Sequence, residues 1–159
     1  MTISPHLRPI TVEDIPAVAA IMAGSALWQR YGVTVESATR RLQRGLEAGA
    51  AIAVAEVDGR VAAFVWYVLE GAFQRSGYIM LFAVEPNLRG QGLGRVLLAY
   101  AEDALFAAST SIVLLVSDFN TEAQRFYQRH GYSEVGALPD YVKDGVSELI
   151  YYKHQPLTG

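Results

Sequence analysis

The sequence contains no cysteine. This absence excludes a disulfide scaffold, a zinc–thiolate site and a cysteine nucleophile. It also agrees with a reducing compartment, so we expect a cytoplasmic protein. The three histidines lack the spacing of metal ligands, and no Gly-x-Ser-x-Gly motif occurs. We therefore predict a site without a metal and without a covalent nucleophile.

An excess of positive charge and a long apolar run are also missing. Thirteen Lys and Arg residues stand against 16 Asp and Glu residues, for a net charge of −3. Nucleic-acid binding needs clustered positive charge, so we expect no nucleic-acid partner. The longest apolar runs, such as 61–69, are strand-sized, well short of the ~20 residues of a membrane-spanning helix. We expect no membrane segment and, from the polar N-terminus, no signal peptide.

What the sequence does contain is ample apolar material for a folded core. Hydrophobic residues make up 52% of the 159 residues. A chain of this length buries a core without disulfides or a structural metal. No repeat, linker or low-complexity block interrupts it. We therefore predict one domain over residues 1–159.

Hydrophobic periodicity and turn residues predict the order β-α-α-β-β-β-α-β-α-β-β. Thr11 is expected to cap the first helix with Asp14 as a capping-box partner, and Gly24 to end that helix before a loop. Asp58-Gly59 predicts a hairpin. The fold class is α/β (α+β), with a mixed, mostly antiparallel central sheet of about seven strands and helices on both faces. The expected strands are 3–10, 51–57, 61–69, 77–84, 111–116, 132–138 and 146–153.

The most informative stretch is "RGQGLGR", residues 89–95, between the 77–84 strand and the helix that follows it. The first N–H groups of a helix have no intrahelical partner, and the helix dipole adds partial positive charge. Glycines let a ligand approach the backbone, and Arg89 and Arg95 add charged donors. This arrangement predicts a site for a phosphate or pyrophosphate. The plainer alternative is a tight strand-to-helix turn.

Two other phosphate-binding motifs fit this stretch less well. A Walker A motif does not occur. Gly90 and Gly92 match the first two glycines of the dinucleotide-binding fingerprint G-x-G-x-x-G/A. The third position of the fingerprint is Arg95, whose large side chain would prevent the helix from packing closely on the strand. Asp118, after the next strand, stands near the expected place of a ribose-binding acid. The three strands and two helices before the motif count further against this alternative.

The stretch matches the pattern Q/R-x-x-G-x-G/A, preceded by Val-Glu-Pro, and resembles the acyl-coenzyme A loop of the GNAT N-acetyltransferase superfamily. The opening "LRPITVEDIPAVAAIM" and the later "NTEAQRFYQRHGY" are similar to further elements of that family. The resemblance covers essentially the whole chain. It implies acetyl-CoA as cofactor and a small-molecule or peptide amine as acceptor. It also allows a homodimer.

The resemblance also implies roles for individual residues. Asn120 would bond the pantetheine amide, or serve only as a helix N-cap. Tyr127, on the same helix face, would bind the cofactor at its sulfur and act as the general acid, or be a core aromatic. Glu85 is the candidate base, with Glu70 or a water chain as alternatives and a solvated turn residue as the plainer reading. The remaining predicted cofactor-binding residues are Phe82, Ala83 and Val84 through their backbone, and the loop residues Arg89, Gly90, Gln91, Gly92, Leu93, Gly94 and Arg95.

The acceptor site is the least defined part of the prediction. Aromatic residues near the expected edges of the fold are candidates, each with core or rim packing as the alternative. Direct transfer in a ternary complex is expected, because no nucleophile for an acyl-enzyme is present. A non-catalytic acyl-CoA-binding sensor or interaction module stays an alternative. The candidate aromatics are Trp28, Tyr31, Trp66, Tyr67 and Tyr141.

Overall fold

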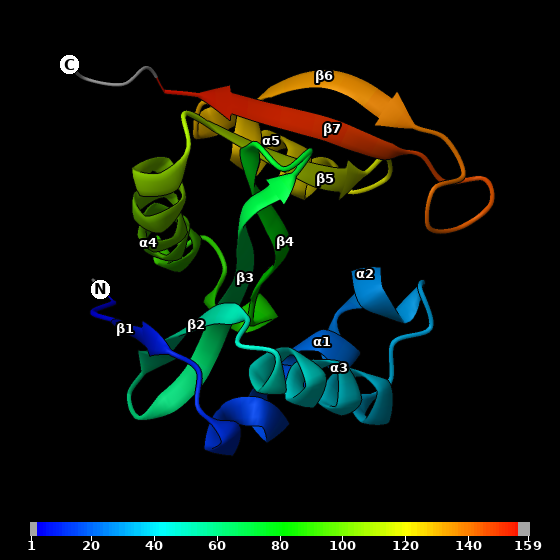
Figure 1. Ribbon diagram of the computed structural model, residues 1–159. Helices are drawn as coiled ribbons and strands as arrows, with labels where there is room; N and C mark the ends of the chain where they lie inside the picture. Colours follow the sequence, from blue (N-terminus) through cyan, green and yellow to red (C-terminus); the bar gives the residue numbers. More distant parts are fainter. Residues whose placement is uncertain (1–2, 156–159) are drawn as a thin grey trace. The chain divides into compact units, whose positions relative to one another are not determined.

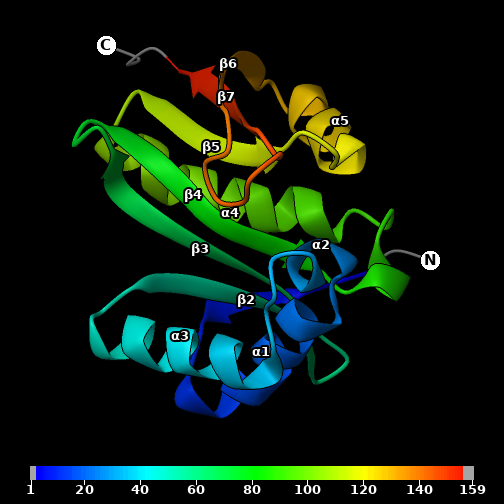
Figure 2. The ribbon, with the colours of Figure 1, turned by 90° about the vertical axis from the view of Figure 1, so that its right-hand side faces the viewer.

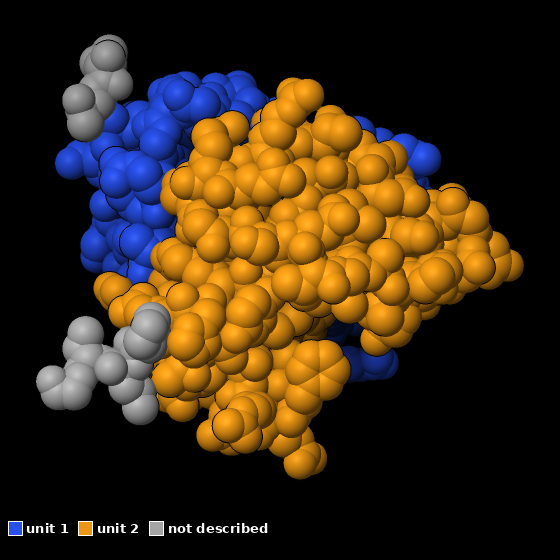
Figure 3. All heavy atoms as spheres, turned by 90° about the horizontal axis from the view of Figure 1, so that it is seen from above, with its two compact units in different colours: residues 1–67, 81–101 blue, residues 68–80, 102–159 orange. Residues whose placement is uncertain are grey.

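The computed structural model describes residues 3–155, which Figure 1 traces from blue to red. Two compact units make up the chain, residues 1–67 with 81–101 and residues 68–80 with 102–159 (Figure 3). The chain passes from one unit to the other within strand β3 (Arg60–Ala72), strand β4 (Ser76–Val84) and helix α4 (Leu93–Ala108). The prediction of one domain stays a prediction.

The strands form a seven-stranded sheet in the order β1-β2-β3-β4-β5-β7-β6. β4 and β5 are parallel, whereas β1–β2, β2–β3, β5–β7 and β6–β7 are antiparallel. The mixed, mostly antiparallel sheet is thereby confirmed. The remaining strands are β1 (His6–Pro9), β2 (Ala51–Val57), β5 (Ser111–Ser117), β6 (Ser133–Leu138) and β7 (Glu148–His154).

The first unit carries helices α1 (Ile15–Gly24), α2 (Ala26–Gln29) and α3 (Val35–Glu47), and α1 and α3 lie together beside β2 (Figure 2). The expected loop after Gly24 is wrong, because only Ser25 is extended and α2 follows at once. Trp28 of α2 packs against the buried Phe64 of β3, with ring centroids 5.9 Å apart, so this helix is held against the strand by an aromatic contact.

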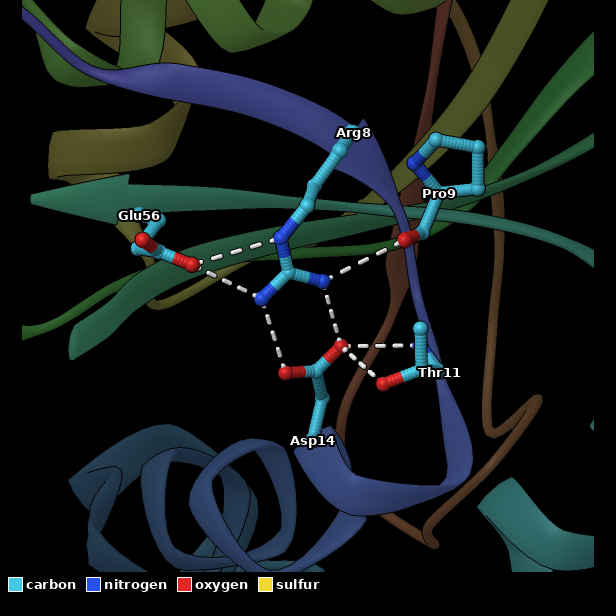
Figure 4. A network of polar contacts seen from close by, with 5 residues as sticks. All are labelled: Arg8, Pro9, Thr11, Asp14 and Glu56. Carbon is cyan, nitrogen blue, oxygen red and sulfur yellow. Dashed lines mark hydrogen bonds and ion pairs between the residues drawn. The ribbon is translucent and has the colours of Figure 1, made fainter. Parts of the chain in front are cut away.

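A polar network fixes the start of the first helical segment (Figure 4). Asp14, in the short 3₁₀ helix η1 (Val12–Asp14), accepts from the backbone N–H of Thr11 at 2.8 Å and from its hydroxyl at 3.0 Å. Arg8 of β1 donates to both oxygens of Asp14 and to Glu56 of β2. The predicted partnership of Thr11 and Asp14 is therefore confirmed, and the arginine links it to two strands.

The predicted hairpin is confirmed, with β2 and β3 joined at Asp58 and Gly59, both at positive φ (52° and 78°). Along β3, neighbouring side chains face different helices. Trp66 packs against α3, whereas burial and, to a smaller degree, the charge of Tyr100 on α4 raise the pKa of Tyr67. The first unit thus has helices on both faces of its strands, as predicted.

In the second unit, the last residues of α4, from Glu102 on, and α5 (Thr121–Arg129) pack on the same face of β5 and β7. Gln128 of α5 donates to the hydroxyl of Tyr151, and Lys153 donates to Glu102 of α4 at 2.9 Å. Tyr151 and Lys153 are two residues apart on β7, so both point to this helical face.

Among the residues that the structure describes, no helix is long and apolar enough to cross a membrane.

Candidate functional site

The glycine loop leaves β4 through the 3₁₀ helix η2 (Pro86–Leu88) and enters α4 at Leu93. Gly90 and Gly92 have φ values of 77° and 85°, in the left-handed region that favours glycine. A Cβ atom at either position would meet open space. The glycines are therefore explained by backbone conformation, and the space beside them stays free for a ligand.

The start of α4 presents backbone donors next to this open space. Val96 donates to the carbonyl of Gly92 at 3.3 Å, so the N–H groups of residues 93–95 precede the intrahelical ladder. Leu93 is only 1% exposed and anchors the helix in the core, so its predicted contribution is limited to its backbone. Arg95 is exposed. This geometry fits a phosphate-bearing cofactor.

Polar side chains brace the loop itself. Arg89 donates through Nε to the carbonyl of Val84 at 3.2 Å, and Gln91 donates to the carbonyl of Asn87 at 3.4 Å. Both side chains are exposed, so they lie at the surface of the loop. Arg89 thus ties the loop to the end of β4 and places its charge beside the glycines.

The last residues of β4 are half-buried, including Phe82, Ala83 and Val84. The parallel ladder with β5 pairs residues 77–79 with residues 112–114, earlier in the strand. The segment predicted to offer its backbone to the pantetheine arm therefore follows this ladder. Its side chains are apolar, as the prediction requires.

Glu85 follows β4 directly. Its N–H donates to the carbonyl of Ala62 at 2.8 Å, and its carboxylate lies 3.7 Å from the guanidinium of Arg60. The Glu85 side chain is 29% exposed and that of Arg60 is 77% exposed. The carboxylate is thus accessible and paired with a surface cation, and its role as base stays a prediction. Glu70 is exposed and has a positive φ of 53° in β3.

Asn120 caps α5, because its Oδ1 accepts from the N–H of Ala123 at 3.2 Å. The N-cap reading is confirmed, and the cofactor contact stays a prediction. Gln124, one turn later, donates to the carbonyls of Ser117 at 3.2 Å and Asp118 at 3.0 Å. The polar face of α5 is therefore fastened to the end of β5.

Tyr127 lies on α5 and is 7% exposed. Its ring packs edge-on against Tyr132, with centroids 5.5 Å apart, and against Phe126 at 5.2 Å. Burial raises the pKa of the Tyr127 phenol well above its usual value of about 10. The phenol therefore stays protonated at neutral pH.

The candidate acceptor aromatics differ in accessibility. Trp66 is 7% exposed, with Arg41 stacked over its ring and its six-membered ring against Gly45, so it is a core residue. Trp28 is half-buried on Phe64. Tyr31 and Tyr67 are also half-buried, and Tyr141 is 62% exposed.

The Nδ1–H of His130, at the end of α5, donates to the carbonyl of Phe126, 2.7 Å away. Within residues 3–155, no group of three or more His, Asp or Glu residues could hold a metal ion.

One buried polar pair, Ser117 and Glu148, was not predicted from the sequence. Glu148, at the start of β7, is 7% exposed, and Ser117, at the end of β5, is 6% exposed. The Ser117 hydroxyl donates to the Glu148 carboxylate, with distances of 3.3 and 3.2 Å to its two oxygens. From the sequence alone, a Glu near the end of an expected strand is predicted to be exposed to solvent. The pairing of Ser117 with Glu148 follows only from the register between β5 and β7.

Comparisons with known proteins bear on these elements together. Residues 21–132 match the Acetyltransferase (GNAT) family. An uncharacterized N-acetyltransferase from Methanocaldococcus jannaschii is 40% identical over 105 residues, which are 65% of this chain and 65% of that protein. An N-alpha-acetyltransferase from Sulfurisphaera tokodaii is 30% identical over 119 residues, 68% of this chain and 70% of that protein.

The fold has counterparts among solved structures. Ard1 from Thermoplasma volcanium is similar with a TM-score of 0.80 at 24% identity, over 98% of this chain and 100% of that chain. The family match extends from α1 through α4, β5 and α5 to Tyr132, and so contains both the glycine loop and Tyr127. The resemblance inferred from the motifs is confirmed. This chain belongs to the GNAT acetyltransferase family.

Proposed function

We propose that this protein is an N-acetyltransferase that moves an acetyl group from acetyl-CoA directly onto a primary amine. The observation that carries the proposal is the glycine loop, with two left-handed glycines, open space beside them and the start of a sixteen-residue helix. Such a loop suits a pyrophosphate. Its place within the segment that matches an acetyltransferase family supports coenzyme A as the ligand.

The residues that would hold the cofactor fall into three groups. The backbone of residues 90–95 offers N–H donors for phosphate oxygens, and Arg89 and Arg95 add positive charge. The backbone of residues 82–84 offers donors and acceptors to an extended arm. Asn120 has an amide side chain that already accepts from α5 and retains its N–H₂ donors for a ligand. Acetyl-CoA supplies the activated acetyl group as a thioester.

The reaction also needs two proton movements. The amine loses a proton as its nitrogen bonds to the acetyl carbon, and Glu85 is the proposed acceptor of that proton. The sulfur gains a proton as the carbon–sulfur bond breaks, and Tyr127 is the proposed donor. Tyr127 carries its proton at neutral pH and so has one to donate.

The acceptor is proposed at the level of a primary amine, on a peptide or on a small molecule. The relative from Sulfurisphaera tokodaii is named an N-alpha-acetyltransferase, which supports a peptide N-terminus. The cytoplasmic location and the homodimer stay predictions, the former based on the absence of cysteine.

The deciding experiment mixes purified protein with acetyl-CoA and a panel of amines that includes short peptides. Free thiol is followed by its reaction with a chromogenic disulfide, and acetylated products are identified by mass spectrometry. We expect thiol release that depends on both protein and amine. Tight acetyl-CoA binding without product on any amine would instead favour a non-catalytic sensor. A shift of NADH fluorescence that acetyl-CoA does not reverse would favour the dinucleotide alternative.

A further inference from the structure

Tyr132 closes the C-terminal end of α5 and is joined there to Tyr127. Its N–H donates to the carbonyl of Tyr127 at 3.0 Å, and the N–H of Gly131, at a φ of 90°, donates to the carbonyl of Gln128 at 3.2 Å. These two bonds form a Schellman motif, in which the side chains at the positions of Tyr132 and Tyr127 commonly touch. Here the two rings meet edge-on, with centroids 5.5 Å apart. Tyr132 is therefore linked to Tyr127 through both the backbone and the ring.

The hydroxyl of Tyr132 has a further attachment, on α4. It donates to Oε2 of Glu102 at 2.8 Å. Tyr132 is only 3% exposed, and burial, followed by the charge of Glu102, raises the pKa of its phenol, so the hydroxyl keeps the proton that it donates. A ring without a hydroxyl would suffice for the contact at the helix end. The bond to Glu102 is thus an additional constraint on the Tyr132 ring.

Lys153 of β7 completes this cluster. Its Nζ donates to the same Glu102 oxygen at 2.9 Å and lies 5.5 Å from the centroid of the Tyr132 ring and 5.9 Å from that of Phe106. The side chains of Glu102 and Lys153 are 16% and 25% exposed, so solvent screens their pairing only in part. All of these residues belong to the second unit. A helix, a strand and the end of α5 therefore meet at the Tyr132 ring.

This cluster limits the freedom of the Tyr127 side chain. The Tyr132 ring is bound at its hydroxyl and faces the ammonium group of Lys153, and it forms one side of the packing around Tyr127, which is 7% exposed. Proton transfer requires a donor within hydrogen-bond reach, and a displacement of about 1 Å can cost about a hundredfold in rate. The orientation of the Tyr127 ring therefore matters for any proton that its phenol delivers.

We propose that Tyr132, held by Glu102 and Lys153, is a positioning residue that keeps the Tyr127 ring in one orientation for proton transfer. This inference rests on the proposed function for the role of Tyr127 as proton donor. None of the three residues touches a reacting atom in this proposal. Their effect on the reaction passes through the ring contact between Tyr132 and Tyr127.

The first test measures the motion of the Tyr127 ring itself, without turnover. The full chain is prepared with tyrosine labelled with carbon-13 at both ε positions, and the Tyr127 signals are identified by their loss in Tyr127→Phe. Exchange spectroscopy and relaxation dispersion give the flip rate of the ring. Tyr132→Phe keeps the ring contact and removes the bond to Glu102, and should raise that rate at least about tenfold. A flip rate equal to that of wild type would overturn the inference.

A matched control lies on the same strand as Lys153. Tyr152 is half-buried, and because side chains alternate along a strand, it points away from the face of β7 that carries Lys153. Tyr152→Phe removes a phenol hydroxyl close to the cluster in sequence but outside it. It should leave both the flip rate of the Tyr127 ring and kcat unchanged. A rise in flip rate as large as that of Tyr132→Phe would overturn the inference.

The second test separates positioning from binding in turnover. Tyr132→Phe should lower kcat about tenfold and leave the KM values for acetyl-CoA and for the amine unchanged. In a Tyr127→Phe background the same substitution should have no further effect on kcat, because the group that it positions is gone. An equal loss of kcat in both backgrounds would overturn the inference, since the effect would then not pass through Tyr127.

Folding is controlled by circular dichroism melting and by acetyl-CoA binding. If Tyr132→Phe does not fold, two variants of Glu102 decide. Glu102→Gln retains an acceptor for the Tyr132 hydroxyl and should keep a slow ring flip, whereas Glu102→Ala removes the acceptor and should speed the flip about tenfold. Equal flip rates in the two variants would overturn the inference, because loss of the acceptor would have no effect of its own.

Failure of the inference and failure of the proposed function give different results. Full kcat in Tyr127→Phe refutes the proposed role of the phenol, and the flip rate alone then decides whether Tyr132 positions the ring. Loss of kcat in Tyr127→Phe, together with wild-type flip rate and kcat in Tyr132→Phe, refutes the inference and leaves the proposed function standing.

Discussion

The guanidinium of Arg8 donates to both carboxylate oxygens of Asp14, at 2.7 and 3.0 Å. One arginine thus ties the beginning of the first helical segment to β1, and its second interaction, with Glu56 at 2.9 Å, reaches β2. Because Asp14 is only 8% exposed, this pairing is screened little by solvent.

The first prediction is that the pairing of Arg8 with Asp14 makes the free energy of unfolding depend on pH in the acidic range. The bonds from Arg8 hold the pKa of Asp14 at about 2, below its ordinary value of 3.8. A lowered folded-state pKa means that the stabilisation is fully present above about pH 4 and is lost as the pH falls through 2. It corresponds to about 2 kcal/mol of unfolding free energy at neutral pH.

Asp14→Asn should therefore lower the unfolding free energy at pH 7 by about 2 kcal/mol, measured by urea denaturation. The difference between wild type and variant should shrink progressively between pH 4 and pH 2. If wild type and variant differed by the same unfolding free energy at pH 4 and at pH 2, the charge of the carboxylate would not be the cause of the difference.

The second prediction concerns the glycine loop. Gly92→Asp places bulk and negative charge at the proposed pyrophosphate site and should abolish acetyl-CoA binding in calorimetry. Gly92→Ala imposes the same positive φ of 85° on a residue with a Cβ atom but adds no charge, and serves as the matched control. Binding by the Ala variant and none by the Asp variant is the expected pattern. Micromolar binding by Gly92→Asp would remove the loop from the cofactor site.

The third prediction concerns the proton donor. Tyr127→Phe should lower kcat by about a hundredfold or more, because general-acid catalysis is worth at least that much, and should leave acetyl-CoA affinity nearly unchanged. Tyr141→Phe removes the hydroxyl of an exposed tyrosine and should keep full activity. Steady-state kinetics and calorimetry together make the measurement. An unaltered kcat in Tyr127→Phe would exclude the phenol as the acid.

The fourth prediction compares the two carboxylates considered as base. Glu85→Gln should lower kcat/KM for the amine about a hundredfold, whereas Glu70→Gln should leave it near the wild-type value. The thiol-release assay measures both. Equal activity of Glu85→Gln and wild type would point to a water chain in place of Glu85.

The fifth prediction tests packing in the first unit. A Cβ atom at Gly45 would overlap the ring of Trp66, so Gly45→Ala should cost about 1–3 kcal/mol of unfolding free energy. Gly24→Ala meets open space in α1 and should be neutral or slightly stabilising. Adding Trp66→Leu to Gly45→Ala should recover part of the loss if the clash is its cause. Urea denaturation of the three variants gives the values, and a Gly45→Ala protein as stable as wild type would refute the overlap.

Much of the fold could be predicted because local signals agreed with one another. Asp58-Gly59 predicted the hairpin, Thr11 with Asp14 predicted the first helical segment, and Asn120 predicted the start of α5, each from residues within four positions of one another. The short helix α2 could not be predicted this way, because its order depends on Trp28 meeting Phe64 some 36 positions later in the chain.

In the candidate site too, features that depend on neighbouring residues could be predicted, and features that depend on distant residues could not. The glycine loop and the N-cap role of Asn120 are local patterns, and the sequence sufficed for them. The burial of Trp66 depends on the absent side chain at Gly45, and the pairing of Ser117 with Glu148 depends on strand register over 31 positions. Neither the burial of Trp66 nor the pairing of Ser117 with Glu148 can be predicted from the residues next to them in the sequence.

The passage of the chain between its two compact units has a practical consequence for experiments with fragments. Each of the three crossings falls inside a hydrogen-bonded strand or helix, at 67/68, 80/81 and 101/102. No exposed linker is present at these points for a protease to cleave or for a gene to be divided. Separate expression of either unit would sever two strands and one helix, so each half would begin with frayed ends and unsatisfied backbone groups.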